Sequence, residues 1–163
     1  MQYSQLRNLL ITGANKGIGY ATVESLIAGT TPYDIIFTSR DPKLGEKSLA
    51  TLRAKYPQTS SKLTYHQLDI NDEKSVTDII SWVEKTYGKL DVLVNNAAIL
   101  YVTSTDEQKH HALQTNFFNT VKFTEQFLPL LSDDAKILMV SSGCGQLSAQ
   151  GKTHTMALNK TAL

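Results

Sequence analysis

Short apolar segments alternate with longer amphipathic segments along most of the 163-residue chain. The apolar segments have the length and composition of buried strands, and they lie at 8–12, 34–39, 63–68, 91–95 and 136–141. The amphipathic segments have helix length, and they lie at 17–29, 43–56, 72–87 and 106–131. This alternation predicts the α/β class, with about five parallel strands in a doubly wound sheet and helices on both faces.

Two of the predicted helices carry a clear apolar stripe, which we expect to face the core. The stripe of 72–87 consists of Val76, Ile79, Ile80 and Val83. The stripe of 106–131 contains Phe117, Phe118, Val121 and Phe127. Either Asn71 or Asp72 can cap the start of the helix that spans 72–87, because both side chains accept hydrogen bonds from backbone amides.

Composition narrows the possible classes of protein. Apolar residues make up 41% of the chain, which is enough for the core of one domain spanning 1–163. The net charge of +1, without a Lys/Arg stripe, argues against a nucleic-acid partner. The sequence contains no evident signal peptide and no apolar run long enough to span a membrane. Cys144 is the single cysteine, so there is no internal disulfide. We therefore expect a cytoplasmic protein. The four histidines lack metal-ligand spacing, so we expect no metal site.

A glycine-rich loop with the sequence TGANKGIG follows the first predicted strand and opens the first helix. Gly13 permits a tight turn, Gly17 lets the backbone approach a pyrophosphate, and Gly19 lets helix and strand pack closely. Backbone amides and the helix dipole then favour phosphate groups. The three glycines can also be simple turn residues. The position between strand and helix favours a dinucleotide site, and thus an NAD(P)-binding Rossmann domain.

Five motifs together resemble the short-chain dehydrogenase/reductase family over residues 8 to about 148. They are the glycine loop and the segments 68–70, 95–98, 115–120 and 140–143. The Asn15–Lys16 pair in the loop resembles the carbonyl reductase branch. Residue Ala98 stands where the family usually has glycine. The resemblance implies that the cofactor is bound by the loop and by two later segments, through Gly13, Asn15, Lys16, Gly17, Ile18, Gly19, Asp69, Ile70, Asn96, Ala97 and Ala98.

The end of the second strand favours NADPH over NADH. Enzymes that use NAD usually place an acidic residue there for the ribose 2′-hydroxyl, whereas this chain has Ser39 followed by Arg40. A guanidinium binds a 2′-phosphate in bidentate fashion, and Lys16 can reach the same group. The alternative is that Arg40 is a solvent-exposed loop charge paired with Asp41.

The catalytic residues are also expected from the family resemblance. Ser142 matches the serine that orients the carbonyl, and Asn116 matches the asparagine of the proton relay. The family's acid is the tyrosine of a Tyr-x-x-x-Lys motif, but no tyrosine follows Tyr101. If residues 156–160 align directly with that motif, Met156 replaces the tyrosine and Lys160 is the catalytic lysine. The thioether of Met156 cannot donate a proton. Otherwise, as in carbonyl reductases, the tail lies in an insertion and the tyrosine follows beyond it.

The resulting hypothesis is an NADPH-dependent, carbonyl reductase-like oxidoreductase that acts on small-molecule aldehydes or ketones. We expect this chain to be its N-terminal part and to be inactive alone. The alternative is a pseudoenzyme or regulatory protein that binds NADPH without hydride transfer. The resemblance also implies that the helix with Phe117, Phe118, Val121 and Phe127 can line a subunit interface, although the carbonyl reductase branch is often monomeric. A monomer or a homodimer is therefore expected, and no nucleic acid or membrane is expected as a partner.

Overall fold

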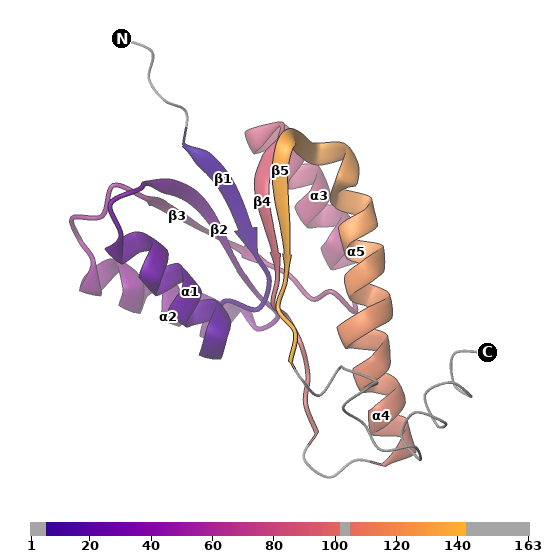
Figure 1. Cartoon of the computed structure of the whole chain (residues 1–163). Helices are drawn as coiled ribbons and strands as arrows, with labels where there is room; N and C mark the ends of the chain where they lie inside the picture. Colours follow the sequence, from indigo (N-terminus) through magenta and orange to yellow (C-terminus); the bar gives the residue numbers. More distant parts are fainter. Residues whose placement is uncertain (1–5, 102–104, 143–163) are drawn as a thin grey trace.

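Five parallel strands form one sheet in the order β3-β2-β1-β4-β5 (Figure 1). The structure is a computed structural model, and it describes residues 6–101 and 105–142. The strands are β1 (Arg7–Ile11), β2 (Tyr33–Ser39), β3 (Lys62–Gln67), β4 (Leu90–Asn95) and β5 (Leu131–Met139). Each strand lies within one residue of its predicted segment at both ends, except β5. The chain moves outward from β1 in both directions, which confirms the predicted doubly wound sheet.

Helices cover both faces of the sheet (Figure 1). On one side lie α1 (Gly17–Ala28) and α2 (Pro42–Lys55), and on the other lie α3 (Glu73–Tyr87) and α5 (Thr120–Phe127). Successive residues of a strand point to opposite faces, so each central strand contributes to two cores. Leu9 and Ile11 pack with α1 and α2, whereas Leu10 between them packs with α3 and α5. Among the described residues, no helix is both long enough and apolar enough to cross a bilayer.

Side chains at the helix starts explain where the helices begin. Asp41 accepts a hydrogen bond from the backbone N–H of Leu44 and is followed by a proline, which favours the first turn of α2. Of the two candidate caps for α3, Asp72 fills the role, because its carboxylate accepts from the backbone N–H of Lys74. Gly88 ends α3 with φ +71°, a conformation that glycine adopts without a steric penalty.

The predicted helical segment over 106–131 is confirmed over 106–130, but it is not one regular α-helix. It consists of α4 (Asp106–Leu113), the π-helix η1 (Gln114–Asn119), α5 and the short 3-10 helix η2 (Leu128–Leu130). The α-helical part ends at Phe127, because proline within η2 lacks a backbone N–H and cannot continue an α-helix. The strand β5 begins at Leu131, five residues before its predicted start. Its first half is polar, so apolar periodicity gave no sign of it.

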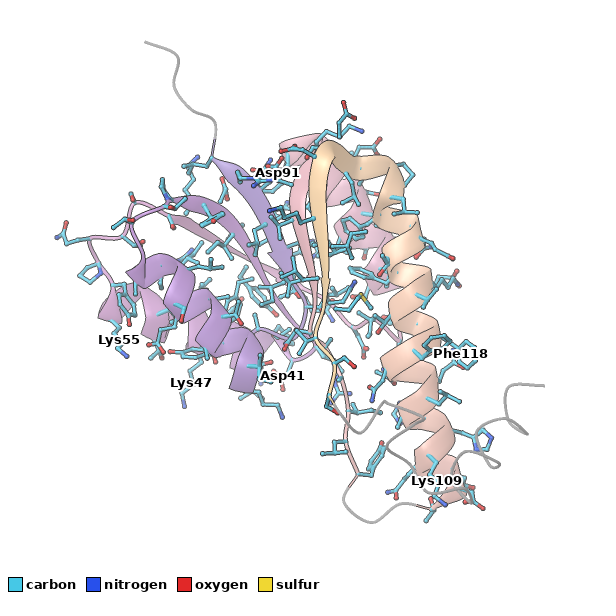
Figure 2. The ribbon with its side chains drawn as sticks, viewed as in Figure 1. Asp41, Lys47, Lys55, Asp91, Lys109 and Phe118 are labelled. Carbon is cyan, nitrogen blue, oxygen red and sulfur yellow. The ribbon has the colours of Figure 1, made fainter. Side chains whose placement is uncertain are left out.

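The prediction that the stripe of 106–131 faces the core is wrong for three of its four members. Phe127 is fully buried, whereas Phe117, Phe118 and Val121 are 55%, 46% and 37% exposed. Figure 2 shows the side chain of Phe118 directed away from the sheet. Phe118 and Phe127 are nine positions apart, which is about 2.5 turns of helix, so regular helical spacing already places them on opposite faces.

Candidate nucleotide-binding site

Residues predicted to bind the cofactor or substrate lie at one edge of the sheet. In a parallel sheet the carboxyl ends of all strands meet at the same edge, where open α/β sheets bind their ligands. Gly13 follows β1, Arg40 follows β2, Asp69 follows β3, Asn96 follows β4 and Ser142 follows β5. Five segments that are far apart in sequence thus converge at this edge (Figure 1).

Each of the three glycines in the loop is required by a different feature of the local geometry. Gly13 and Gly17 have φ +66° and +57°, a region that side-chain-bearing residues rarely adopt. A Cβ atom on Gly19 would lie 2.5 Å from Asn96 Nδ2 and 2.6 Å from the Gly13 oxygen. A Cβ on Gly17 would meet no atom within 4 Å. Gly19 therefore permits close packing of helix and loop, and Gly17 faces open space at the helix start.

Hydrogen bonds from three neighbouring segments hold this loop. The Thr12 hydroxyl oxygen accepts from the backbone N–H groups of Asn96 and Ala97 at 2.9 and 2.8 Å. The Asn96 side-chain amide donates to the oxygens of Thr12 and Gly13 at 2.8 and 3.0 Å. The Thr38 oxygen accepts from the Ala14 N–H at 2.7 Å, and Ser48 Oγ donates to the Asn15 oxygen at 2.8 Å. The loop conformation is therefore set by the protein itself.

An Asn96→Ala substitution is expected to lower the free energy of unfolding by about 1–3 kcal/mol, because two hydrogen bonds to the loop are lost. Binding of nucleotide should weaken as well, since the loop is no longer held. Urea unfolding and calorimetric titration measure the two effects. Asn8→Ala is the control, because the Asn8 amide donates to the Lys89 oxygen at the opposite edge. A control that weakened nucleotide binding equally would contradict this role of Asn96.

The start of α1 carries the features of an anion site. The first N–H groups of a helix have no partner within it, and the helix dipole adds partial positive charge. The first turn holds no acidic residue, and Lys16 occupies the capping position without a side-chain hydrogen bond to the helix. Lys16, Gly17 and Ile18 are exposed. These residues fit a phosphate group of a dinucleotide.

Arg40 provides a second positive charge at this edge. Its side chain is exposed, and within residues 6–101 and 105–142 it forms no ion pair. Arg40 is thus solvent-exposed, as the alternative interpretation has it, but the Asp41 pairing of that interpretation is not found among these residues; the Asp41 carboxylate caps α2. The Arg40 guanidinium is available to an anionic ligand.

The remaining predicted nucleotide contacts differ in which atoms they can offer. Asp69 is partly buried, with its N–H bound to Ser75 Oγ and its carboxylate accepting from the Asn71 N–H. Ile70 is 9% exposed and packs in the core, so its side chain has little surface to offer a ligand. Ala97 lies against Gly13, and Ala98 is exposed beyond it.

Asn116, predicted for the proton relay, lies within η1 and binds the loop after β4. Its Oδ1 accepts from the Ile99 N–H at 2.9 Å, and its Nδ2 donates to the Ile99 oxygen at 2.8 Å. π-helical turns are frequent at functional sites. Ser142 is exposed just past the end of β5. Lys160 and Met156 lie outside the described residues, so their predicted roles remain predictions.

Sequence reasoning missed three residues that organise this edge. They are Thr12, Ser48 and Tyr65, whose hydroxyl lies 3.2 Å from Ser39 Oγ at the end of β2. Thr12 belongs to the glycine motif, so its position was a signal for its role. Ser48 and Tyr65 lie within a helix and a strand, and nothing in their local sequence indicates a long-range contact.

Across residues 6–101 and 105–142, no group of three or more His, Cys, Asp or Glu residues is arranged to hold a metal ion.

Comparisons with known proteins give a consistent result. A family model described as short chain dehydrogenase matches residues 7–155. The chain is 38% identical over 137 residues to bovine carbonyl reductase [NADPH] 1, covering 82% of this chain and 48% of the relative. It is 32% identical over 165 residues to (+)-neomenthol dehydrogenase of Arabidopsis thaliana, covering 86% of this chain and 55% of the relative. The chain thus spans about half the length of these relatives.

Two solved structures extend the similarity to three dimensions. Menthone neomenthol reductase from Mentha piperita superposes with a TM-score of 0.82 at 25% identity, covering 94% of this chain and 66% of that structure. NADPH-bound carbonyl reductase from chicken fatty liver superposes with a TM-score of 0.75 at 28% identity, covering 88% and 62%. The sequence resemblance and the fold class are both confirmed.

Proposed function

This chain belongs to the short-chain dehydrogenase family, and on that basis we propose that it binds NADPH as the nucleotide-binding part of a carbonyl reductase-like oxidoreductase. The observation that carries the choice of NADPH is that Arg40, directly after β2, is exposed and has no ion-pair partner among the residues that the structure describes. The relatives named as NADPH enzymes support the same choice. Residues 1–163 are proposed to act as one domain.

The residues at the sheet edge fit the chemical groups of NADPH. The loop from Gly13 to Gly19 would hold the pyrophosphate, because it combines free helix amides with open space at Gly17. Arg40 and Lys16 would bind the 2′-phosphate with charge-assisted hydrogen bonds. The segments 69–70 and 96–98 would border the adenosine and the second ribose.

The proposed substrate is a small-molecule aldehyde or ketone. Bound NADPH supplies the hydride for reduction of a carbonyl group. Ser142 would orient the carbonyl oxygen by donating a hydrogen bond, since preorganised donors stabilise the alkoxide that develops. Asn116 would hold the loop after β4 and contribute to the proton relay. Lys160 would act only if the tail aligns with the family motif.

Titration of the chain with NADPH and NADH tests the proposed cofactor. We expect NADPH to bind at least tenfold more tightly, because a charge-assisted hydrogen bond is worth about 1.5–3 kcal/mol. Calorimetry at fixed salt concentration gives both dissociation constants. Equal affinity for the two nucleotides, or no binding of either, would remove the basis of the proposal.

The 163-residue chain is not expected to oxidise NADPH with simple aldehydes or quinones. No tyrosine follows Tyr101, and a general acid typically contributes ~10²–10⁴-fold to the rate. Absorbance at the NADPH band measures turnover. A longer chain that also carries a Tyr-x-x-x-Lys segment should reduce these substrates, and Ser142→Ala should lower the turnover of that longer chain with little change in NADPH affinity. A longer chain that binds NADPH without turnover favours the pseudoenzyme. Turnover by the 163 residues alone would mean that a residue other than tyrosine is the acid.

A further inference from the structure

The position at the end of the second strand, which usually distinguishes NAD from NADP, is buried in this chain. Ser39, the last residue of β2, is fully buried. Its Oγ donates to the Asp41 oxygen at 2.7 Å and lies 3.2 Å from the Tyr65 hydroxyl of β3. Because the Ser39 proton is directed to Asp41, Tyr65 is the donor of the bond between the two hydroxyls.

The Tyr65 hydroxyl remains a donor at neutral pH. Burial raises the pKa of the Tyr65 hydroxyl above its usual range. The same hydroxyl lies 3.4 Å from the Ser39 backbone oxygen. Tyr65 therefore contacts both the side chain and the main chain of Ser39.

The turn that follows is held from both sides. The Ser39 oxygen accepts from the Leu68 N–H at 3.0 Å, and the Arg40 oxygen accepts from Gln67 Nε2 at 3.2 Å. The Asp41 oxygen also accepts from the Gly45 N–H at 3.0 Å. Each backbone oxygen from residue 39 to 41 thus has a partner, while the Arg40 side chain remains exposed.

Gly45 of α2 closes the space around Ser39. A Cβ atom at this position would overlap Ser39 Oγ and the ring of Tyr65. The helix therefore packs directly on the pair of hydroxyls. Ser39 has neither exposed surface nor a spare proton for a ligand.

We propose that Tyr65 is a positioning residue for recognition of the 2′-phosphate, acting through Ser39 to hold the turn that presents Arg40, and that Ser39 does not itself contact the ligand. This inference rests on the proposed binding of NADPH. It assigns selectivity to a chain of hydrogen bonds from Tyr65 through the buried Ser39 to Asp41, which connects β3, β2 and the start of α2.

The test compares 2′,5′-ADP with 5′-AMP as ligands of the 163-residue chain, measured by calorimetry. Tyr65→Phe removes one hydroxyl and retains the ring, so the fold should persist. We expect affinity for 2′,5′-ADP to fall by about threefold to tenfold, while affinity for 5′-AMP stays unchanged. The matched control is Tyr87→Phe, because the Tyr87 hydroxyl donates to Asp34 at the other end of β2.

A double substitution shows whether Tyr65 acts through Ser39. The variant Tyr65→Phe with Ser39→Ala should bind 2′,5′-ADP as weakly as Ser39→Ala alone, because both changes break one chain of hydrogen bonds. Additive losses would overturn the inference, and so would a Tyr65→Phe variant that keeps the wild-type ratio of affinities. A wild-type chain that does not prefer 2′,5′-ADP to 5′-AMP would instead overturn the proposed cofactor.

Discussion

An Arg40→Asp variant is expected to bind NADPH about tenfold to a hundredfold more weakly than the wild-type chain, with a much smaller change for NADH. Arg40 is exposed after β2 and forms no ion pair among the described residues, so its guanidinium is free for the 2′-phosphate. Aspartate removes that attraction and adds repulsion between two anions. Parallel titrations with the two cofactors measure the effect.

The control for this prediction is Lys47→Asp, which changes the net charge by the same amount. Lys47 is exposed on α2, and Figure 2 shows its side chain directed away from the sheet. If the effect of Arg40 were only the overall charge of the chain, both variants would lose the same affinity for NADPH. If Arg40 binds the 2′-phosphate, Lys47→Asp changes affinity little, and the loss in Arg40→Asp decreases at high salt.

Phe127→Ala is expected to lower the free energy of unfolding by about 3–5 kcal/mol. The Phe127 ring is fully buried, and its centroid lies 4.8 Å from that of Phe123. Both rings pack with strand residues in the core on the side of α3 and α5. Removing the ring leaves a cavity that the surrounding side chains fill only in part. Urea unfolding followed by circular dichroism gives the difference.

Phe118→Ala provides the comparison, because it deletes the same ring from the preceding helical turns. Phe118 is 46% exposed and its ring meets that of Phe117 at 5.1 Å. We expect its substitution to change the free energy of unfolding by less than about 1 kcal/mol. Similar losses in both variants would mean that Phe118 does not lie on an exposed face of this helical segment.

Most of the fold was predictable from the sequence, because in most elements the buried positions are apolar and follow the period of a strand or a helix. In the central strands, consecutive apolar residues serve both faces of the sheet, and the resulting apolar run is easy to recognise. The start of β5 did not follow that rule, because the residues after Leu131 are polar. The π-helix η1 was unpredictable for a different reason, since one extra residue per turn leaves no mark in composition.

The candidate site was predictable as far as local motifs extend. The glycine loop owes its shape to positive φ angles at Gly13 and Gly17, and glycine is the residue that signals such angles. The burial of Ser39 was not predictable, because it depends on Tyr65 and Gly45. Those contacts exist only after β3 and α2 have packed against β2, so they belong to tertiary structure.

The bonds from Asn96 to the glycine loop also determine when the site can form during synthesis. The amide of Asn96 reaches the oxygens of Thr12 and Gly13 across 84 and 83 positions of sequence. A ribosome must therefore translate β4 and release it from the exit tunnel before the loop near the N-terminus acquires its final shape. Until then the loop of a nascent chain lacks the partners that hold it, and the proposed nucleotide site could not yet gain stability from ligand binding.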